Sequence, residues 1–279
     1  MKAIRVLHVS DIHFGRHCLV PMVEAIEAMI ATGEFDVVAF SGDMTQRAWK
    51  RQLTRGAAFL AHASRHARVI AVPGNHDIEW WWSPLHIFGE APINRKFRKY
   101  IGPDLEPVLR VDGATFVGLN TAQGVSLRTL TKRPRDISII GDLRWQQVEW
   151  AHNEFIASPM SDVRVVVMHH NLLKGELSQR YGFRHPAQVL DWFGQIGVDL
   201  VLCGHDHQEG FERRAHAKGG IVVSTAGTTS NRSRGGRPAA VNVIALDKVA
   251  IAVRSLVWSS SDRALVPGLE QHFSRGNEA

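Results

Sequence analysis

Short runs of apolar, β-branched residues recur along the chain, and each one stops at a polar turn. Runs of this length bounded by turn-forming residues are typical of buried β-strands. Those that end in polar motifs lie at residues 3–9, 36–40, 69–72, 163–168 and 198–203. Further strands are predicted at 107–111 and 115–119, joined by Asp112-Gly113, at 220–225, and in a closing β-hairpin over 239–258.

Segments with apolar residues at helical spacing lie between these strands. Pro21 suits the first turn of a helix, and the apolar residues that follow share one of its faces: Met22, Ile26, Met29 and Ile30. Further helices are expected over about 47–64, 142–157 and 186–196. Because no linker divides the chain, we expect a single domain. It covers residues 1–258, with 78–107 as a candidate cap or insertion and 259–279 as a C-terminal tail.

The composition is that of a protein with a large core, since 44% of its 279 residues are hydrophobic and 22% are charged. The formal net charge of +6 favours anionic ligands, but the cations are scattered along the sequence, so nucleic acid is permitted without being indicated. Cys18 and Cys203 are too few and too far apart for a disulfide framework. With no signal peptide and no apolar run of about 18 residues, we expect a soluble cytoplasmic protein.

At three of the predicted strand ends lie aspartate, histidine and asparagine residues, whose side chains can bind metal ions. Asp11 and His13 follow the first run two positions apart, so on an extended strand end both side chains point the same way. Asp43 follows the second run directly after a glycine. The third run leads to Asn75-His76-Asp77, which offers an amide oxygen, an imidazole and a carboxylate on one turn.

The two later runs end in histidine pairs. His205 and His207, in Gly204-His205-Asp206-His207, lie on one turn where both can reach one centre. His169 and His170 are adjacent, so on an extended backbone they point to opposite faces and only one should reach the centre directly. Together the five strand ends supply oxygen and nitrogen ligands without a thiolate, which suits two divalent transition ions.

In this order and spacing the motifs resemble those of the calcineurin-like metallophosphoesterase superfamily, and they span residues 11–207. The resemblance implies an α/β fold, a four-layer α/β/β/α sandwich with two mixed β-sheets and a dinuclear site at the carboxyl-end loops. It also assigns three ligands to one metal (Asp11, His13, His207), three to the other (Asn75, His169, His205), and Asp43 as the bridge. His169 is chosen over His170 because it directly follows the strand. The ions would be two divalent metals, Mn, Fe, Co or Zn.

Two such ions can share a water, lower its pKa and hold a phosphoryl oxygen for in-line attack. His76 is not needed as a ligand, so it is free to protonate the leaving oxygen or to stabilise the developing charge, with Asp77 orienting it. These two are the predicted catalytic residues. His170 and Arg232 are weaker candidates for contacts with the substrate.

A finer resemblance concerns the substrate. Four motifs are most similar to the bacterial class III cyclic-nucleotide and glycerophosphodiester phosphodiesterase group: Ser-Asp-Ile-His, Ser-Gly-Asp-Met-Thr, Pro-Gly-Asn-His-Asp and Gly-His-Asp-His. Met44 and Pro73 stand where Ser/Thr protein phosphatases have arginines, and no tyrosine shortly follows Gly-Asp as in purple acid phosphatases. We therefore expect a phosphodiesterase acting on a cyclic-nucleotide-like or other small, nucleotide-like diester.

Three alternatives stay open. A UDP-2,3-diacylglucosamine-type pyrophosphatase would use the same metals, with Trp80–Trp82 and the basic loop 128–135 serving its lipid substrate. An SbcD-like nuclease shares Asp-Ile-His, but such enzymes usually have further DNA-contacting domains for which this length leaves no room. A non-catalytic scaffold would keep the fold without the metals, and the presence of all seven ligands argues against it. The sequence does not give the oligomeric state.

Overall fold

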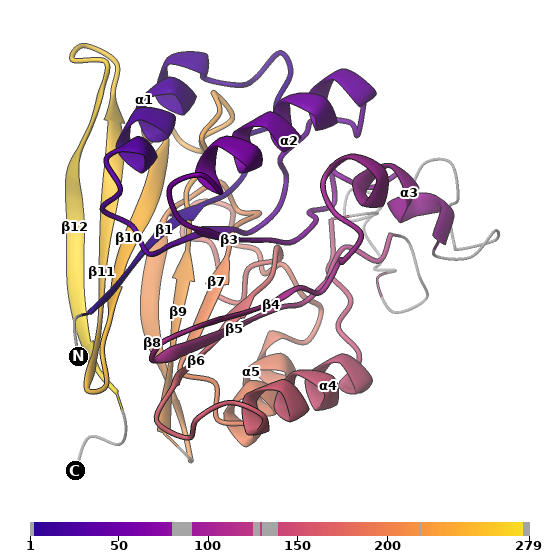
Figure 1. Cartoon of the computed structure of the whole chain (residues 1–279), viewed down its shortest axis with the longest axis vertical. Coiled ribbons are helices and arrows are strands. Elements are labelled where there is room, and N and C mark those ends of the chain that lie inside the picture. The colour runs from indigo at the N-terminus through magenta and orange to yellow at the C-terminus, as the bar shows by residue number, and fades with distance from the viewer. Residues whose placement is uncertain (1–2, 80–90, 125–128, 130–138, 218, 276–279) are drawn as a thin grey trace.

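The computed structural model describes residues 3–79, 91–124, 129, 139–217 and 219–275 (Figure 1). Trp80–Trp82 lie outside the described residues, as does the basic loop 128–135 apart from Thr129. The fold is built from two six-stranded sheets and five helices within the described ranges.

The first sheet is built around the N-terminal strand β1 (Ile4–Val9). Its order is β12-β11-β10-β1-β2-β3. The other strands are β2 (Val37–Phe40), β3 (Arg68–Ala71), β10 (Ala240–Leu246), β11 (Ala250–Ser259) and β12 (Ala264–Ser274). β1, β2 and β3 are parallel, whereas β10 runs antiparallel to β1. The carboxyl ends of β1, β2 and β3 therefore meet at one edge.

The second sheet has the order β4-β5-β6-β7-β9-β8. Its strands are β4 (Val108–Val111), β5 (Ala114–Gly118), β6 (Val163–Val167), β7 (Leu200–Cys203), β8 (Gly210–His216) and β9 (Gly219–Thr225). The four strands β5, β6, β7 and β9 are parallel, and the outer strands β4 and β8 are antiparallel to their neighbours. Both sheets are thus mixed, as predicted.

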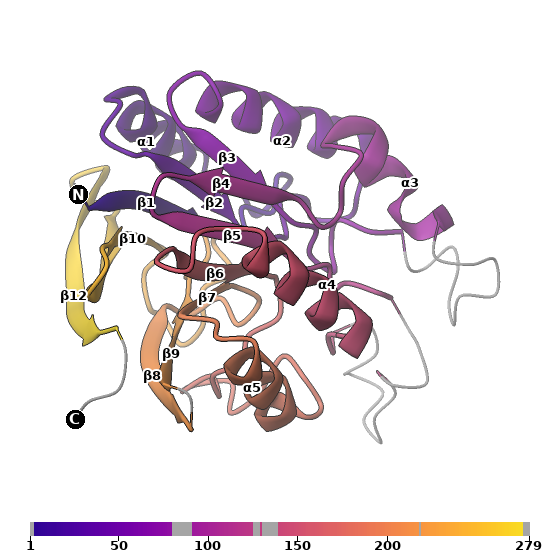
Figure 2. The ribbon, with the colours of Figure 1, turned by 60° about the horizontal axis from the view of Figure 1, so that its bottom comes forward.

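The sheets pack face to face with helices outside (Figure 2). Residues of both sheets share the central core, including Val6 and Ile70 of the first and Phe116 and Leu202 of the second. The outer face of the first sheet is covered by α1 (Val20–Ala31) and α2 (Lys50–Ala63). That of the second is covered by α4 (Trp145–Ile156) and α5 (Pro186–Gln195). The predicted four-layer α/β/β/α sandwich is confirmed.

Three elements differ from the sequence-based expectation. The segment 259–279 is not simply a tail, because β12 extends the first sheet and pairs with β11 from Ala250 opposite Ser274 to Ser259 opposite Ala264. β12 was not predicted because it is a sheet edge whose residues are mostly exposed, which leaves little apolar pattern. β8 is also an edge strand, and the sequence analysis did not predict it. Nor did the sequence analysis predict the helix α3 (Ala91–Tyr100), which lies beside α2 within the candidate cap 78–107 (Figure 1).

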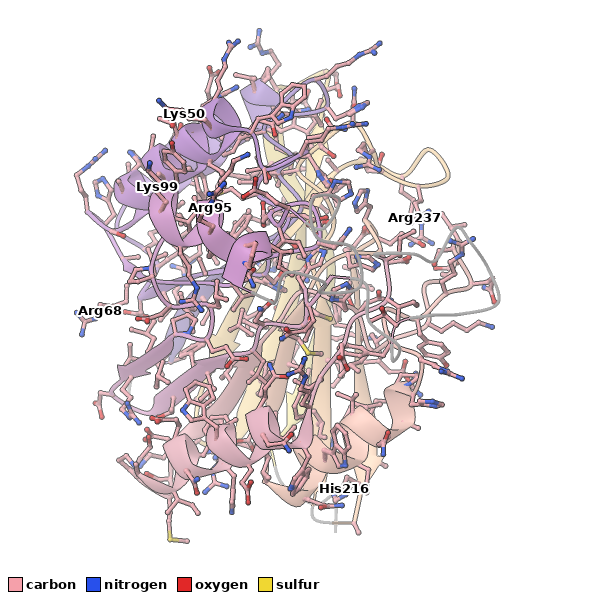
Figure 3. All side chains as sticks on the ribbon, turned by 90° about the vertical axis from the view of Figure 1, so that its right-hand side faces the viewer. Lys50, Arg68, Arg95, Lys99, His216 and Arg237 are labelled. Atoms are coloured by element: carbon pink, nitrogen blue, oxygen red, sulfur yellow. The ribbon has the colours of Figure 1, made fainter. Side chains whose placement is uncertain are left out.

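Cations are spread over different faces of the molecule. Lys50, Arg95 and Lys99 lie over α2 and α3, while Arg68 lies near β3 and Arg237 on the other side of the view (Figure 3). This distribution matches the scatter seen in the sequence. Among the described residues, no helix combines the length and the apolar character needed to span a bilayer.

Candidate metal centre

The polar motifs gather at the edge where the parallel strands of both sheets end. Each motif begins within four residues of the end of its strand, after β1, β2, β3, β6 and β7 respectively. Such an edge is where α/β folds bind ligands. The residues brought together are Asp11, His13, Asp43, Asn75, His169, His205 and His207.

One half of the site consists of Asp11, His13, Asp43 and His207, whose ligand atoms all lie within 4.8 Å of one another. His207 Nε2 is 3.2 Å from Asp11 Oδ1 and 3.1 Å from His13 Nε2. His13 Nε2 is 3.8 Å from Asp43 Oδ2. These side chains are buried, with His207 only slightly exposed.

The other half consists of Asn75, His169 and His205. His169 Nε2 is 3.0 Å from Asn75 Oδ1, and His205 Nδ1 is 3.1 Å from the same oxygen. The two imidazole nitrogens are 3.2 Å apart. His169 Nε2 is also 3.4 Å from Asp43 Oδ2, so one carboxylate oxygen faces both halves.

The carboxylates each keep one oxygen for the centre. Asp11 Oδ2 accepts hydrogen bonds from Ser10 Oγ (2.6 Å) and the His205 backbone N–H (3.0 Å), whereas its buried Oδ1 has no hydrogen-bond partner among the described residues. Asp43 Oδ1 accepts a hydrogen bond from the His76 backbone N–H at 2.8 Å, and Oδ2 faces the histidines. The protein therefore fixes both carboxylates and leaves a negative oxygen pointing inward.

The histidines are oriented in the same way. A carbonyl oxygen only accepts, so the 2.8 Å contact of His169 Nδ1 with Ser41 O and the 3.0 Å contact of His207 Nδ1 with Arg232 O place the proton on Nδ1 in each ring. In the neutral rings, the lone pair of Nε2 then faces the other ligand atoms. Lone pairs and carboxylate oxygens that converge in this way repel one another unless a cation lies between them, so the residues fit two metal ions.

The backbone is strained at the same residues. Asp11, His13, Asp43, His205 and His207 all have positive φ, between 50° and 72°. A non-glycine residue in this region costs on the order of 1 kcal/mol or more. Backbone hydrogen bonds between the loops, from the Asp11 N–H to Gly42 O and from the His13 N–H to Asp43 O, hold this conformation at 3.0 Å each. The folded state is therefore less stable than it would be without this strain, which is needed to position these five side chains.

Two glycines of the motifs allow the loops to approach closely. A Cβ atom on Gly74 would overlap Asp43 Oδ1 and the Asp43 backbone nitrogen. A Cβ atom on Gly204 would overlap Ser10 Oγ and meet Asp11 Oδ2 at 2.5 Å. The glycines in Gly-Asn-His and Gly-His-Asp-His are therefore required because a side chain would displace the carboxylates.

The electrostatics of the site also favour a cation. Burial by itself raises the pKa values of Asp11 and Asp43, but the neighbouring histidines hold both well below the usual range. Burial lowers the pKa of His13 to about 4 and that of His205 to about 3, so both rings are neutral at pH 7. For His169, burial lowers the pKa, but the charges of Asp43 and Asp11 and the hydrogen bonds with Asp43 and Ser41 together outweigh it and raise the pKa to about 9. The negative potential of the two carboxylates thus attracts positive charge to the centre.

A sequence profile of the calcineurin-like phosphoesterases matches residues 4–209, which is most of the chain. The chain belongs to this family. Phosphoesterases of the family typically bind two metal ions, in agreement with the two halves of the site. No curated protein sequence matches this chain significantly.

Solved structures support the fold. A purple acid phosphatase from yellow lupin aligns with a TM-score of 0.67 at 12% sequence identity. The alignment covers 98% of this chain and 54% of the lupin chain, so this chain spans about half the length of that protein. Plasmodium GAP50 aligns with a TM-score of 0.61 at 12% identity over 100% of this chain and 90% of the other. Vacuolar protein sorting 29 from Cryptosporidium parvum aligns with a TM-score of 0.51 at 11% sequence identity. The alignment covers 99% of this chain and 100% of the other. At these identities the likeness concerns the fold alone.

His76 lies beside the centre, but Asp77 does not orient it. His76 Nδ1 donates to Gln46 O at 2.8 Å, and its ring meets the His13 ring edge-on at 4.9 Å. Asp77 instead accepts backbone N–H groups of Met44 (3.1 Å), Thr45 (2.7 Å) and Gly74 (3.0 Å). The predicted orienting role of Asp77 is wrong, because its fully buried carboxylate is turned towards the loops after β2 and β3. Gln46 acts through its backbone carbonyl, which no side-chain pattern reveals.

We predict that Asp77→Asn lowers stability and metal content together. The amide NH₂ of asparagine would face a backbone N–H donor, leaving a buried group unsatisfied at a cost of about 2 kcal/mol. The loops that position Asp43 and Asn75 would loosen as a result. Chemical denaturation and metal analysis measure both effects. Loss of turnover with unchanged stability and metal content would instead restore the orienting role.

His170 and Arg232 have different surroundings. His170 is fully buried, its ring packs against the rings of His169 (5.1 Å) and His205 (4.6 Å), and its Nδ1 lies 2.8 Å from Thr121 Oγ1. It therefore supports the ligands from behind, and its predicted contact with the substrate is wrong. Arg232 lines the pocket over the centre. His169 Nε2 lies 3.0 Å from Asn75 Oδ1 and 3.4 Å from Asp43 Oδ2, so the structure places His169 within the ligand cluster.

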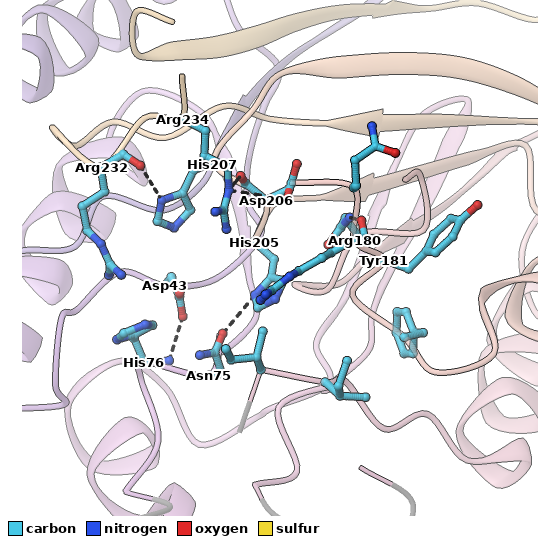
Figure 4. Close-up of a pocket in the computed structure, with 15 residues that line it drawn as sticks. Asp43, Asn75, His76, Arg180, Tyr181, His205, Asp206, His207, Arg232 and Arg234 are labelled. Atoms are coloured by element: carbon cyan, nitrogen blue, oxygen red, sulfur yellow. Dashed lines mark hydrogen bonds and ion pairs between the residues drawn. The ribbon is translucent and has the colours of Figure 1, made fainter. Parts of the chain in front are cut away.

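A pocket of about 290 Å³ opens over Asp43, Asn75 and His205 (Figure 4). Its lining includes Arg180, Tyr181 and Arg234, which the sequence analysis did not identify. Arg234 could have been identified from the sequence, because it lies two residues after the candidate Arg232 in the loop that follows β9. No sequence pattern pointed to Arg180 and Tyr181, since they belong to the irregular segment between β6 and α5.

Proposed function

We propose that this chain is a phosphodiesterase that depends on two divalent metal ions. The observation that carries the proposal is the division of the ligands into two groups that both face Asp43 Oδ2. Asp11, His13 and His207 would hold one ion, and Asn75, His169 and His205 the other, with Asp43 between them. Oxygen and nitrogen ligands suit Mn, Fe, Co or Zn.

When bound, two such ions polarise the phosphoryl group and make the attacking water more acidic. The chain itself contributes the proton transfer at the leaving group. His76 lines the pocket beside Asp43 and Asn75, and Gln46 O fixes its Nδ1–H. Proton exchange is thereby confined to Nε2, from which His76 would protonate the leaving oxygen.

The choice of a diester rests on the motifs that are similar to the class III phosphodiesterase group, such as Ser10-Asp11-Ile12-His13. A small, nucleotide-like diester fits a pocket of about 290 Å³ better than a large one. The pyrophosphatase alternative depended on Trp80–Trp82 and the loop 128–135, most of which lies outside the described residues. It is therefore an outcome of the test below.

The test compares hydrolysis of bis(p-nitrophenyl) phosphate and p-nitrophenyl phosphate by protein stripped with a chelator and reconstituted with Mn²⁺. We expect diester cleavage that requires added metal and exceeds monoester cleavage in kcat/KM. The stripped protein without metal is the control. Preference for the monoester would indicate a phosphatase, and inactivity on both would favour the pyrophosphatase or a non-catalytic scaffold.

A further inference from the structure

Three arginines surround the pocket over the candidate metal centre. Arg180, Arg232 and Arg234 all line it, and their guanidinium groups point into the space above Asp43, Asn75 and His205 (Figure 4). Arg180 comes from the segment between β6 and α5, and the other two from the loop between β9 and β10. Positive charge is therefore presented from two sides of one cavity.

The loop with Arg232 and Arg234 is tied directly to the metal-binding motif. Arg232 O accepts the Nδ1–H of His207 at 3.0 Å, and Arg234 Nε donates to Asp206 O at 2.7 Å. Farther along, Arg237 pairs with Glu176 of the opposite segment. Binding elements held this firmly lose little entropy when a ligand arrives. The Arg232 backbone and the Arg234 side chain are therefore held against the metal-binding motif.

Arg232 has an unused donor. Its Nη1 atom is shielded from solvent and has no hydrogen-bond partner within the described parts of the chain. A buried N–H of a charged group is costly when unsatisfied. Guanidinium groups match the geometry of phosphate oxygens and bind them through paired hydrogen bonds. Because Arg232 also lines the pocket, its guanidinium group is suited to an anionic group of a ligand.

The charge balance exceeds what one scissile diester needs. The charges of two divalent ions would be balanced by the carboxylates of Asp11 and Asp43, the diester and the hydroxide formed from the attacking water, so the surplus comes from the arginines. The Asp206 carboxylate lies 3.6 Å from Arg234 Nε and offsets that arginine, whereas Arg232 makes no ion pair among the described residues. The pocket therefore has positive charge left over for a second anion.

We propose that Arg232 and Arg234 bind a second phosphate group, located on the part of the substrate that is not cleaved. The inference rests on the proposed phosphodiesterase activity and narrows its substrate class to phosphorylated diesters. Both arginines lie beyond residue 209, where the family match ends, so the match itself does not specify them.

The test uses two esters with the same scissile group: thymidine 5′-(p-nitrophenyl phosphate), and the same compound with an added 3′-phosphate. For the metal-reconstituted protein we expect kcat/KM to be at least about tenfold higher for the 3′-phosphorylated ester, mainly through KM, because a charged hydrogen-bonded pair contributes that much. Arg232→Gln and Arg234→Gln should each lower the ratio of kcat/KM for the 3′-phosphorylated ester to that for the plain ester, with metal content retained.

Arg237→Gln is the matched control, since it removes the same charge from the same loop outside the pocket and should keep the preference. Equal kcat/KM for the two esters in the unaltered protein would overturn the inference alone, because metal-dependent cleavage of the plain ester would still support the phosphodiesterase. An equal loss on both esters in the arginine variants would also overturn it. Failure to hydrolyse any ester with metal present would overturn the proposed function and the inference together.

Discussion

Asp43→Asn is expected to abolish tight binding of both metal ions and to lower metal-dependent turnover by at least about 100-fold. Losing even an outer hydrogen-bond partner of a ligand costs about 10- to 100-fold in metal affinity or activity, so losing the shared ligand should cost more. Asp43 Oδ2 is 3.8 Å from His13 Nε2 and 3.4 Å from His169 Nε2, so its charge serves both groups. In the variant, Oδ1 would keep its hydrogen bond with the His76 N–H and the amide NH₂ would face the centre.

Metal content after gel filtration, together with the thermal shift on adding Mn²⁺, measures this effect. Asp104→Asn makes the same substitution at an exposed position and is the control. The variant should lose both ions in parallel. Loss of only one ion would show that Asp43 belongs to a single site and would contradict the bridging arrangement.

His76→Ala should keep both metal ions and lower kcat by roughly 10²- to 10⁴-fold on a diester with an alkyl leaving group. The backbone N–H of residue 76, which donates to Asp43 Oδ1, is unchanged by the substitution, so the metal ligands stay in place. An alkoxide needs a proton as it leaves, whereas p-nitrophenolate is stable without one. The loss should therefore be much smaller with bis(p-nitrophenyl) phosphate.

Parallel kinetics on an alkyl diester and the nitrophenyl diester, with metal analysis of each preparation, test this role. His66→Ala, on the exposed surface after α2, is the matched control. An equal loss on both substrates would mean that His76 positions the substrate or stabilises charge. Loss of metal would mean that it supports the ligands.

The location of the centre illustrates how stability and function compete in this fold. Five of the seven candidate ligands have positive φ, although none of them is glycine. Strain of this kind persists only where the surrounding structure determines the backbone, as the paired loops after β1 and β2 do here. The sandwich thus provides the rigidity, and the loops at the strand ends provide the chemistry.

By itself, the sequence predicted buried strands with polar motifs at their carboxyl ends, and its resemblance to the calcineurin-like family implied the layered fold. Buried parallel strands must be short apolar runs, and their carboxyl ends lie at one edge, so motifs such as Asp11-x-His13 and His205-x-His207 could be assigned to one site from local pattern alone. The alternation of side chains along β6 also predicted that His169 and His170 would point in different directions, and only His169 reaches the cluster.

Only the tertiary structure decided which groups support those ligands. Gln46 O lies 30 residues from His76, and Arg234 approaches Asp206 across 28 residues. Asp77 directly follows His76 in the sequence, yet its carboxylate accepts hydrogen bonds from the backbone N–H groups of Met44 and Thr45. β12 leaves little apolar pattern because it is an exposed edge. Such contacts depend on how distant segments pack, and no local pattern of residues specifies that.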